Sequence, residues 1–206
     1  MFLNKKVIIK YKKNVHCFME NNENGRLVPR QVFFTRGLGK HKEKLNSFEL
    51  ALRNAGIERF NLVSVSSILP PGCKIIGRKK GLDQLSPGQV VYTVMSKNSS
   101  SEPGRLIASA VGCAVPVDMR IYGYLSEHSS FGQREREAGD YAEDLAAEML
   151  ASTLGIPFDV DSDYDAKREI FKIDGRIVKT QNISQAAVCD KGGKWTTVIA
   201  AAVFVL

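Results

Sequence analysis

Two adjacent serines, Ser66 and Ser67, have a setting in this 206-residue sequence that could support chemistry on the backbone itself. They follow the short apolar run 62–65 and precede Pro70 and Pro71, which continue neither a strand nor a helix. A hydroxyl constrained in this way could attack the carbonyl of Ser66 and form an ester. Elimination and hydrolysis would then cut the chain and leave a ketone where Ser67 stood. Alternatively, the serines simply end a strand and hydrogen-bond their own backbone.

The elements that must position these serines are predicted to be mostly strands. Apolar and β-branched runs predict strands at 32–34, 62–65, 90–95, 106–115 and 121–126, with a helix as the alternative for 106–115. The loop at 36–40, which lacks the full spacing of a phosphate-binding loop, is predicted to be a turn. Polar runs predict hairpins at 96–103, at Asp174-Gly175 and at 190–194, the last joining 186–189 to 195–206.

Two helices complete the prediction. The first, of about three turns, is capped by Asn46 or Ser47 and stops at Gly56. Its apolar stripe consists of Phe48, Ala51, Leu52 and Ala55. The second spans 133–154, and its predicted buried face consists of Ala138, Tyr141, Ala142, Leu145 and Met149. Many strands with two principal helices predict an α+β fold in which sheets pack face to face and the helices lie outside.

Length and composition limit the class of protein. A content of 44% apolar residues in one chain of this length predicts a single domain. The four cysteines are far apart without a C-x-x-C pair, which argues against a zinc ribbon and favours reduced thiols. The longest apolar run, 198–206, is too short to span a membrane, and the first ten residues do not resemble a secretory signal. We therefore expect a cytoplasmic protein with no membrane partner.

The net charge of +7 is concentrated in the first third of the chain. Residues 1–66 hold 13 of the 29 basic residues and 5 of the 22 acidic residues, so this part carries +8 and the remainder −1. Such a segment could bind nucleic acid, but no helix-turn-helix, zinc finger or RNA-binding signature accompanies it. We therefore predict that residues 1–27 form a loose basic extension, that the structured domain covers 28–206, and that nucleic acid is not a partner.

From residue 28 onward the sequence resembles the pyruvoyl-dependent arginine decarboxylase family. Five segments carry the resemblance in family order: LNSFELALRNAGI (45–57), NLVSVSSILPPG (61–72), YGYLSEH (122–128), AGDYAEDLAAEML (138–150) and GKWTTVIAAAVFVL (193–206). The resemblance implies a four-layer α/β/β/α sandwich. It also implies cleavage between Ser66 and Ser67 into a β chain (1–66) and an α chain (67–206), with a covalent pyruvoyl cofactor derived from Ser67.

The resemblance further implies roles for individual residues. Asn61 would hydrogen-bond around the pyruvoyl group and support processing; the alternative is an asparagine that caps the start of a strand. Glu127 matches the proton donor of the family; the alternative is a glutamate at an exposed strand end. A carboxyl in this role must be partly desolvated, so that it stays protonated near neutral pH. Ser66 would carry the new C-terminus and border the substrate.

Glu49 and Leu52 match the substrate-binding positions of the family. Arginine is a cation, so a carboxylate at Glu49 would hold its guanidinium, and Leu52 would line its methylene groups. Some relatives have aspartate at the position of Glu49. A structural alternative is a capping box, in which Glu49 turns back to the backbone near Asn46, with Leu52 in the core.

The three histidines show no metal-ligand spacing, and no metal is expected. His128 adjoins Glu127, but neighbouring strand residues point to opposite faces, so we do not expect a proton relay.

Taken with the resemblance, the sequence predicts a self-processing decarboxylase that forms a Schiff base with L-arginine and releases agmatine and carbon dioxide. The resemblance implies trimers or hexamers with active sites between subunits. The alternatives are a pyruvoyl decarboxylase of histidine or ornithine, or a non-catalytic basic binding protein.

Overall fold

The computed structural model describes residues 27–155 and 177–206. The strands of this part are β1 (Gln31–His41), β2 (Asn61–Ser64), β3 (Ile68–Leu69), β4 (Lys74–Ile75), β5 (Val90–Ser100), β6 (Leu106–Pro116), β7 (Gly123–Phe131), β8 (Ile177–Val188) and β9 (Trp195–Val205). Its helices are α2 (Lys44–Ala55), α3 (Arg78–Leu82) and α4 (Glu135–Thr153). The five predicted strands are confirmed as β1, β2, β5, β6 and β7, and 106–115 is a strand rather than a helix. The predicted hairpin at Asp174-Gly175 and the extension before residue 27 lie outside the described residues.

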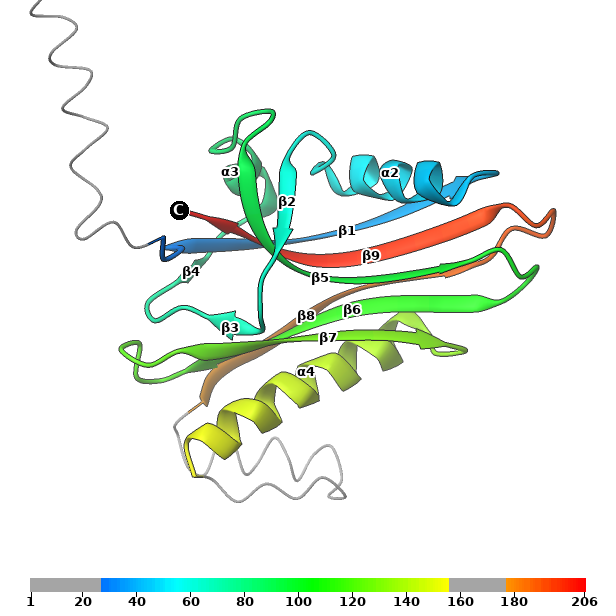
Figure 1. Ribbon diagram of the computed structural model, residues 1–206. Helices are drawn as coiled ribbons and strands as arrows, with labels where there is room; N and C mark the ends of the chain where they lie inside the picture. The colour runs from blue at the N-terminus through cyan, green and yellow to red at the C-terminus, as the bar shows by residue number, and fades with distance from the viewer. Residues whose placement is uncertain (1–26, 156–176) are drawn as a thin grey trace, which may run out of the picture.

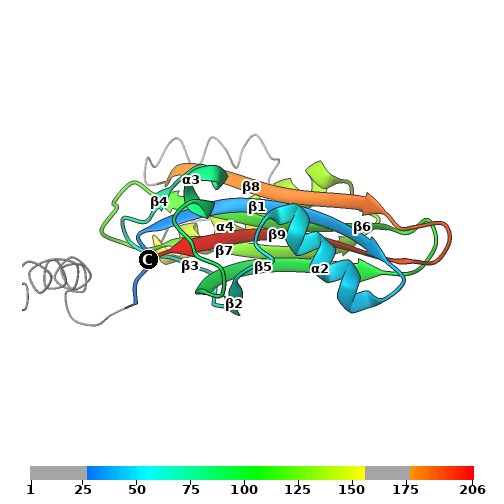
Figure 2. The same cartoon turned by 90° about the horizontal axis from the view of Figure 1, so that it is seen from above.

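The elements form four layers, which confirms the predicted α/β/β/α sandwich (Figures 1 and 2). A five-stranded sheet has the order β2-β5-β9-β1-β4, and a four-stranded sheet has the order β3-β7-β6-β8. Helices α2 and α3 cover the outer face of the five-stranded sheet, and α4 covers the outer face of the four-stranded sheet. No helix in the described part of the chain is long and apolar enough to cross a membrane.

The central strands are buried on both faces because each lies between a helix and the opposite sheet. In β9, Ile199 and Val203 belong to the core beneath α2, whereas Ala200 and Phe204 belong to the core between the sheets. This alternation is the two-residue period of a strand. It explains why the C-terminal segment is apolar almost without interruption.

The predicted turn at 36–40 is wrong, because β1 runs straight through it. Gly37 and Gly39 lie directly under α2: a Cβ on Gly37 would be 2.0 Å from Ala51 O, and one on Gly39 would be 2.1 Å from Ser47 O. The glycines therefore allow a helix to approach the strand closely, and they do not form a turn.

Two predicted hairpins are also wrong. β5 and β6 follow each other in sequence but belong to different sheets, and so do β8 and β9. β6 pairs with β7 and β8, while β9 pairs with β5 and β1. The turns at 101–105 and 189–194 thus carry the chain from one sheet to the other, which brings an apolar strand into the middle of each sheet.

Helix α2 begins earlier than predicted. Its N-cap is Glu43, which makes no side-chain capping bond, and Gly56 ends it in the left-handed conformation, as predicted. Ser47 cannot cap the helix because its hydroxyl is buried, donating to Lys44 O and contacting Thr197 Oγ1 at 2.7 Å.

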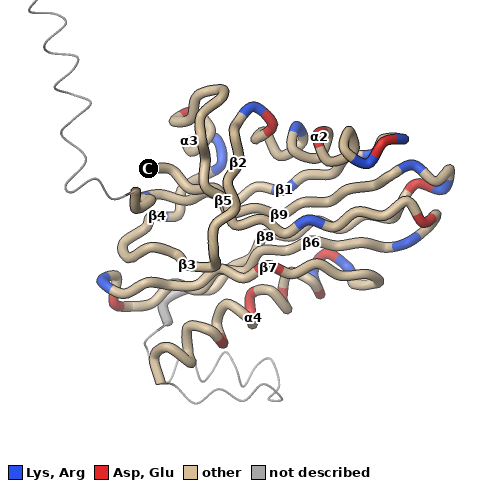
Figure 3. Tube along the Cα trace, in the orientation of Figure 1, with Lys and Arg blue, Asp and Glu red and all other residues tan. Residues whose placement is uncertain are grey.

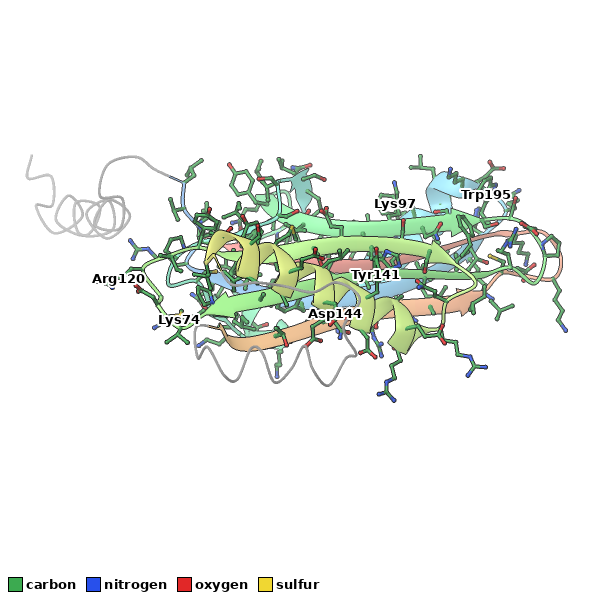
Figure 4. All side chains as sticks on the ribbon, turned by 90° about the horizontal axis from the view of Figure 1, so that it is seen from below. Lys74, Lys97, Arg120, Tyr141, Asp144 and Trp195 are labelled. Atoms are coloured by element: carbon green, nitrogen blue, oxygen red, sulfur yellow. The ribbon has the colours of Figure 1, made fainter. Side chains whose placement is uncertain are left out.

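The buried face of α4 is only partly as predicted. Ala138 and Ala142 are buried, but Tyr141 is 48% exposed, and Leu145 and Met149 are only half-buried. The residues that face the sheet are small for the most part: Ala138, Gly139, Ala142, Ala146, Ala147, Leu150 and Ala151. Small side chains let the helix lie against the strands, and a Cβ on Gly112 of β6 would come within 2.0 Å of Ala142 O. Figure 4 shows α4 across the sheet, with Tyr141 and Asp144 labelled.

Candidate active site

Ser66 and Ser67 lie where the chain passes from the edge strand of one sheet to the edge strand of the other. β2 is the edge of the five-stranded sheet, and β3 is the edge of the four-stranded sheet (Figure 1). Before the serines, Val65 N–H donates to Thr93 O of β5 at 3.0 Å. After them, Leu125 N–H of β7 donates to Ser67 O at 2.8 Å. The segment is therefore fastened to both sheets.

The carbonyl of Ser66 is the acceptor of a tight turn centred on Ser67. Ile68 N–H donates to Ser66 O at 2.8 Å, which closes a three-residue turn. The neighbouring bond between β3 and β7 runs from Leu125 N–H to Ser67 O, and the N–H of Ile68 is directed instead to Ser66. Attack on the Ser66 carbonyl would place negative charge on its oxygen, where this donor already points.

Glu127 of β7 lies beside Ser67, as its predicted role requires. Ser67 Oγ donates to Glu127 Oε2 at 3.3 Å. Glu127 is two residues beyond Leu125, so both side chains lie on the face of β7 that looks toward the other sheet. The structure therefore brings a hydroxyl and a carboxyl together at the rim of the sandwich, where the Glu127 side chain is exposed.

The other predicted site residues contact different groups. Asn61 starts β2, and its amide Nδ2 donates to Gly88 O at 2.7 Å, in agreement with the strand-capping alternative. Glu49 pairs with Arg53 one helical turn later, at 2.7 Å between Oε1 and Nε. Because α2 begins at Lys44 and Glu49 faces Arg53, the capping-box alternative is wrong. Neither the Asn61 contact nor the Glu49 contact involves Ser67 or Glu127.

Leu52 is half-buried and packs against the core beneath α2, on the same helix as Glu49. His128 points to the other face of β7, as expected. There the centroid of its ring lies 4.4 Å from the centroid of the Tyr141 ring. Its Nε2 contacts Gln133 Oε1 at 2.7 Å. Within the described ranges no three His, Cys, Asp or Glu residues are grouped to hold a metal ion.

Sequence reasoning missed the backbone groups of the site. The N–H groups of Ile68 and Leu125 and the carbonyl of Thr93 hold the serine segment. Every residue except proline carries an N–H, so residue type gives no signal for such a role. The register of β3 against β7 selects Leu125 N–H and that of β2 against β5 selects Thr93 O, and register depends on the tertiary fold.

Comparison with known proteins gives one consistent family. The family model for pyruvoyl-dependent arginine decarboxylase matches residues 31–206. A pyruvoyl-dependent arginine decarboxylase of Methanococcoides burtonii is 57% identical over 180 residues, which are 87% of this chain and 100% of that protein. The enzyme of the same name from Nitrosopumilus maritimus is 58% identical over 180 residues, 87% of this chain and 98% of that protein. A probable enzyme of this kind from Chloroherpeton thalassium is 56% identical over 176 residues, 85% and 97% of the two chains.

These matches cover far more than half of the chain and nearly the whole of each relative. The residues matched by the family model include Ser66, Ser67 and Glu127 and the strands that hold them. They do not favour a non-catalytic binding protein or a decarboxylase of another amino acid. The chain therefore belongs to the pyruvoyl-dependent arginine decarboxylase family.

Proposed function

We propose that the protein cleaves itself between Ser66 and Ser67 and then converts L-arginine to agmatine and carbon dioxide. The observation that carries this proposal is the contact of 3.3 Å between Ser67 Oγ and Glu127 Oε2. It joins the residue that would become the cofactor to the residue that would supply the proton. The names of the relatives support arginine as the substrate.

The surroundings of Ser67 fit a pyruvoyl group. A serine has the β-oxygen that must be eliminated to leave a ketone, and this oxygen points to Glu127. Conversion would leave the carbonyl carbon and oxygen of residue 67 in place, so its bond from Leu125 N–H would persist. When formed, the pyruvoyl ketone supplies the electron sink that decarboxylation of an amino acid requires.

The proposed self-cleavage needs only water as a reactant. Ser67 Oγ attacks the carbonyl carbon of Ser66 and loses its proton, and the C–N bond breaks as the nitrogen takes up a proton. An ester thus replaces the peptide bond, while Ile68 N–H stabilises the oxyanion that forms on the way. Loss of the Ser67 Cα proton expels the Ser66 carboxylate and leaves a dehydroalanine. Water then converts its nitrogen to ammonia and leaves the ketone.

Glu127 would act after cleavage as a general acid. Its Oε2 would deliver the proton that takes the place of the departing carbon dioxide on the substrate carbon. Such a donor must hold its proton near neutral pH, which requires a partly desolvated carboxyl. Glu127 is exposed in the single chain, so a subunit packed over this rim would provide the desolvation.

The side-chain end of the substrate would bind through Glu49. Its present partner is the guanidinium of Arg53, which is the group that an arginine substrate also carries. This pair is exposed and spaced i,i+4, so exchanging one guanidinium for another costs little. Leu52 would contact the methylene groups, Ser66 would border the site with its new carboxylate, and Asn61 would support processing.

A homotrimer, or a pair of trimers, would complete the site. Apolar residues are exposed close to the serine pair: Val63 is 40% exposed, Ile68 38% and Val90 52%. A neighbouring subunit packed there would bury them together with Glu127.

The family match begins at residue 31, which supports a separate extension at 1–27 and a domain at 28–206. Within the described ranges, the buried thiols of Cys73 and Cys189 form no disulfide, which supports a cytoplasmic location.

The first test is the intact mass of the purified protein under denaturing, reducing conditions. Cleavage would divide 22.8 kDa by length into about 7 kDa (66 of 206 residues) and about 15 kDa (140 of 206). The larger fragment should begin with a pyruvoyl group. A Ser67→Ala variant should stay whole. A wild-type chain that also stays whole after long incubation would contradict the proposal.

The second test measures carbon dioxide release from arginine, ornithine and histidine. Arginine should be the preferred substrate, and Glu49→Gln should raise KM for arginine more than it lowers kcat. Equal rates with ornithine would contradict selection of the guanidinium by Glu49.

A further inference from the structure

Two buried polar side chains of β5 cross the space between the sheets. Ser96 Oγ donates to His128 O at 2.5 Å, and Asn98 Nδ2 donates to Ser130 O at 2.8 Å. Ser96 is 4% exposed and Asn98 8% exposed. The core between the sheets is otherwise mainly apolar near this point, and it includes Val94 of the same strand. Buried polar groups are costly unless they are hydrogen-bonded, so these bonds strongly favour one placement of β5 against β7.

The bond from Ser96 reaches β7 at the residue immediately after Glu127. On the other side of Glu127, Leu125 N–H is bonded to Ser67 O. The backbone that carries the carboxylate is therefore bonded toward residue 67 and toward β5, in addition to its ladder with β6. β3 pairs with β7 only at 123 and 124, so beyond these residues β7 has no neighbour from β3. β7 remains paired with β6 there, and Ser96 adds a hydrogen bond to this part of β7 from the opposite sheet.

Cleavage would make this support more important. In the intact chain, residues 65–67 join β2 covalently to β3, and these two edge strands are hydrogen-bonded to β5 and β7. Once the bond between Ser66 and Ser67 is broken, this connection is lost, whereas the bonds from Ser96 and Asn98 persist. Together with the core between the sheets, they then keep β5 joined to β7 at the rim where Glu127 must act.

We infer that Ser96 is a positioning residue for Glu127: its hydrogen bond to the carbonyl of His128 holds β7 against β5, so that the carboxylate stays at the reacting carbon after the chain is cut. Asn98 assists at Ser130, farther from the carboxylate. This inference rests on the proposed function, in which Glu127 donates the proton.

The test compares Ser96→Ala with Ser109→Ala. Ser109 is a matched control, because its buried hydroxyl also joins the two sheets, by donating to Val198 O at 3.2 Å, but it makes no contact with β7 through this bond. Both variants should self-cleave, as measured by intact mass, and should have similar thermal midpoints. Ser96→Ala should lower kcat per cleaved site on the order of 10- to 100-fold with little change in KM, because a small misplacement of a catalytic group is costly.

Ser109→Ala should keep kcat near the wild-type value, and Ser96→Thr, which retains the hydroxyl, should restore it. Should Ser96→Ala fail to fold, Ser96→Cys preserves the size with a weak donor and should give an intermediate kcat. Equal kcat losses in Ser96→Ala and Ser109→Ala would overturn the inference, since packing alone would explain them. A Ser96→Ala precursor that folds but stays whole would also overturn it. Failure of the wild-type chain to cleave or to release carbon dioxide would instead contradict the proposed function.

Discussion

Glu127 and Ser67 meet through a single hydrogen bond, so the acid can be removed without disturbing the backbone of the site. Glu127→Gln keeps the size of the side chain but has no acidic proton. We expect kcat to fall by about 10²–10⁴-fold with a small change in KM, because general acids contribute rates of this order. Carbon dioxide release per cleaved chain measures the effect, with cleavage counted by mass. Glu102→Gln is the control, since Glu102 pairs with Arg105 in the turn between β5 and β6. A Glu127→Gln enzyme with normal kcat would refute the assignment.

The N–H of Ile68, which donates to Ser66 O, can also be tested by itself. Replacing the amide between Ser67 and Ile68 by an ester removes the donor to Ser66 O and keeps the side chain. Cleavage should slow on the order of 10²–10³-fold, as for loss of one oxyanion donor. A time course of intact mass measures the rate, and Ile68→Val, which retains the N–H, serves as the control. An ester variant that cleaves as fast as the control would show that this donor is not used.

Cys73 provides a prediction that depends on pH. Burial raises the pKa of its thiol from 9.0 to about 12. The thiolate is the reactive form, so at pH 8 the folded protein should react with a thiol reagent about 10³-fold more slowly than the unfolded chain. Because the folded thiol holds its proton more tightly, this group favours the folded state below pH 9 and loses that contribution as the pH rises toward 12. A variant with Cys73 as the single cysteine isolates the signal, and rapid labelling of its folded form would contradict this burial.

At the scale of elements, the contact between α2 and β1 determines where Glu49 and Leu52 lie. A Cβ at Gly39 would come within 2.1 Å of Ser47 O, so Gly39→Ala must push the helix away from the strand. We expect a loss of about 1–3 kcal/mol in unfolding free energy, typical of overpacking. KM for arginine should also rise, because the helix carries the substrate-binding residues. Gly77→Ala is the matched control, since a Cβ there has no atom within 4 Å. An unchanged thermal midpoint in Gly39→Ala would contradict the close packing.

Sequence patterns predicted elements better than they predicted how elements join. An apolar run indicated β6, with a helix as the alternative, and Gly56 indicated the end of α2, because burial and the left-handed C-cap leave local signals. The hairpin predicted between β5 and β6 failed because a turn sequence does not tell which sheet the next strand enters. The turn predicted at Gly37 and Gly39 is wrong because a glycine under a helix and a glycine in a loop look alike in sequence.

The same limit applied to the site. The roles of Ser67 and Glu127 stay predictions from the residues that carry the resemblance, and the structure brings their side chains into contact. The supports from Ile68 and Leu125 are backbone groups that only the register reveals. Ser96 lies in a polar run that suggested a turn, whereas the structure buries it between the sheets.

At the scale of the whole molecule, charge is distributed unevenly over the layers. Asp and Glu residues follow one another along α4, whereas α3 begins with Arg78, Lys79 and Lys80 (Figure 3). The outer helices thus differ in charge, while the serine pair lies at the seam between the two sheets. This location lets the chain be cut without opening either core.

Cleavage should therefore leave two chains that remain together. The 1–66 piece contributes β1, which pairs with β9 along all eleven of its residues and with β4 on its other side. It also buries Val32, Phe33 and Ile57 completely, each contributing about 1.5–3 kcal/mol. We expect both fragments to elute as one species in size-exclusion chromatography under native conditions and to separate only in denaturant.

Refolding distinguishes the two forms. The uncut Ser67→Ala chain refolds with α2 and β1 tethered to their sheet, whereas cleaved protein must first bring two separate chains together. Recovery of the cleaved form after dilution from denaturant should therefore fall more steeply as the protein concentration is lowered. Assembly of subunits affects both forms, so the comparison isolates the cost of the cut. In the chromatography experiment, a fragment of about 7 kDa that elutes alone from native protein would show that β1 does not hold the two chains together. In the refolding experiment, equal recovery of the cleaved and uncut forms at every protein concentration would show that the cut leaves refolding unchanged.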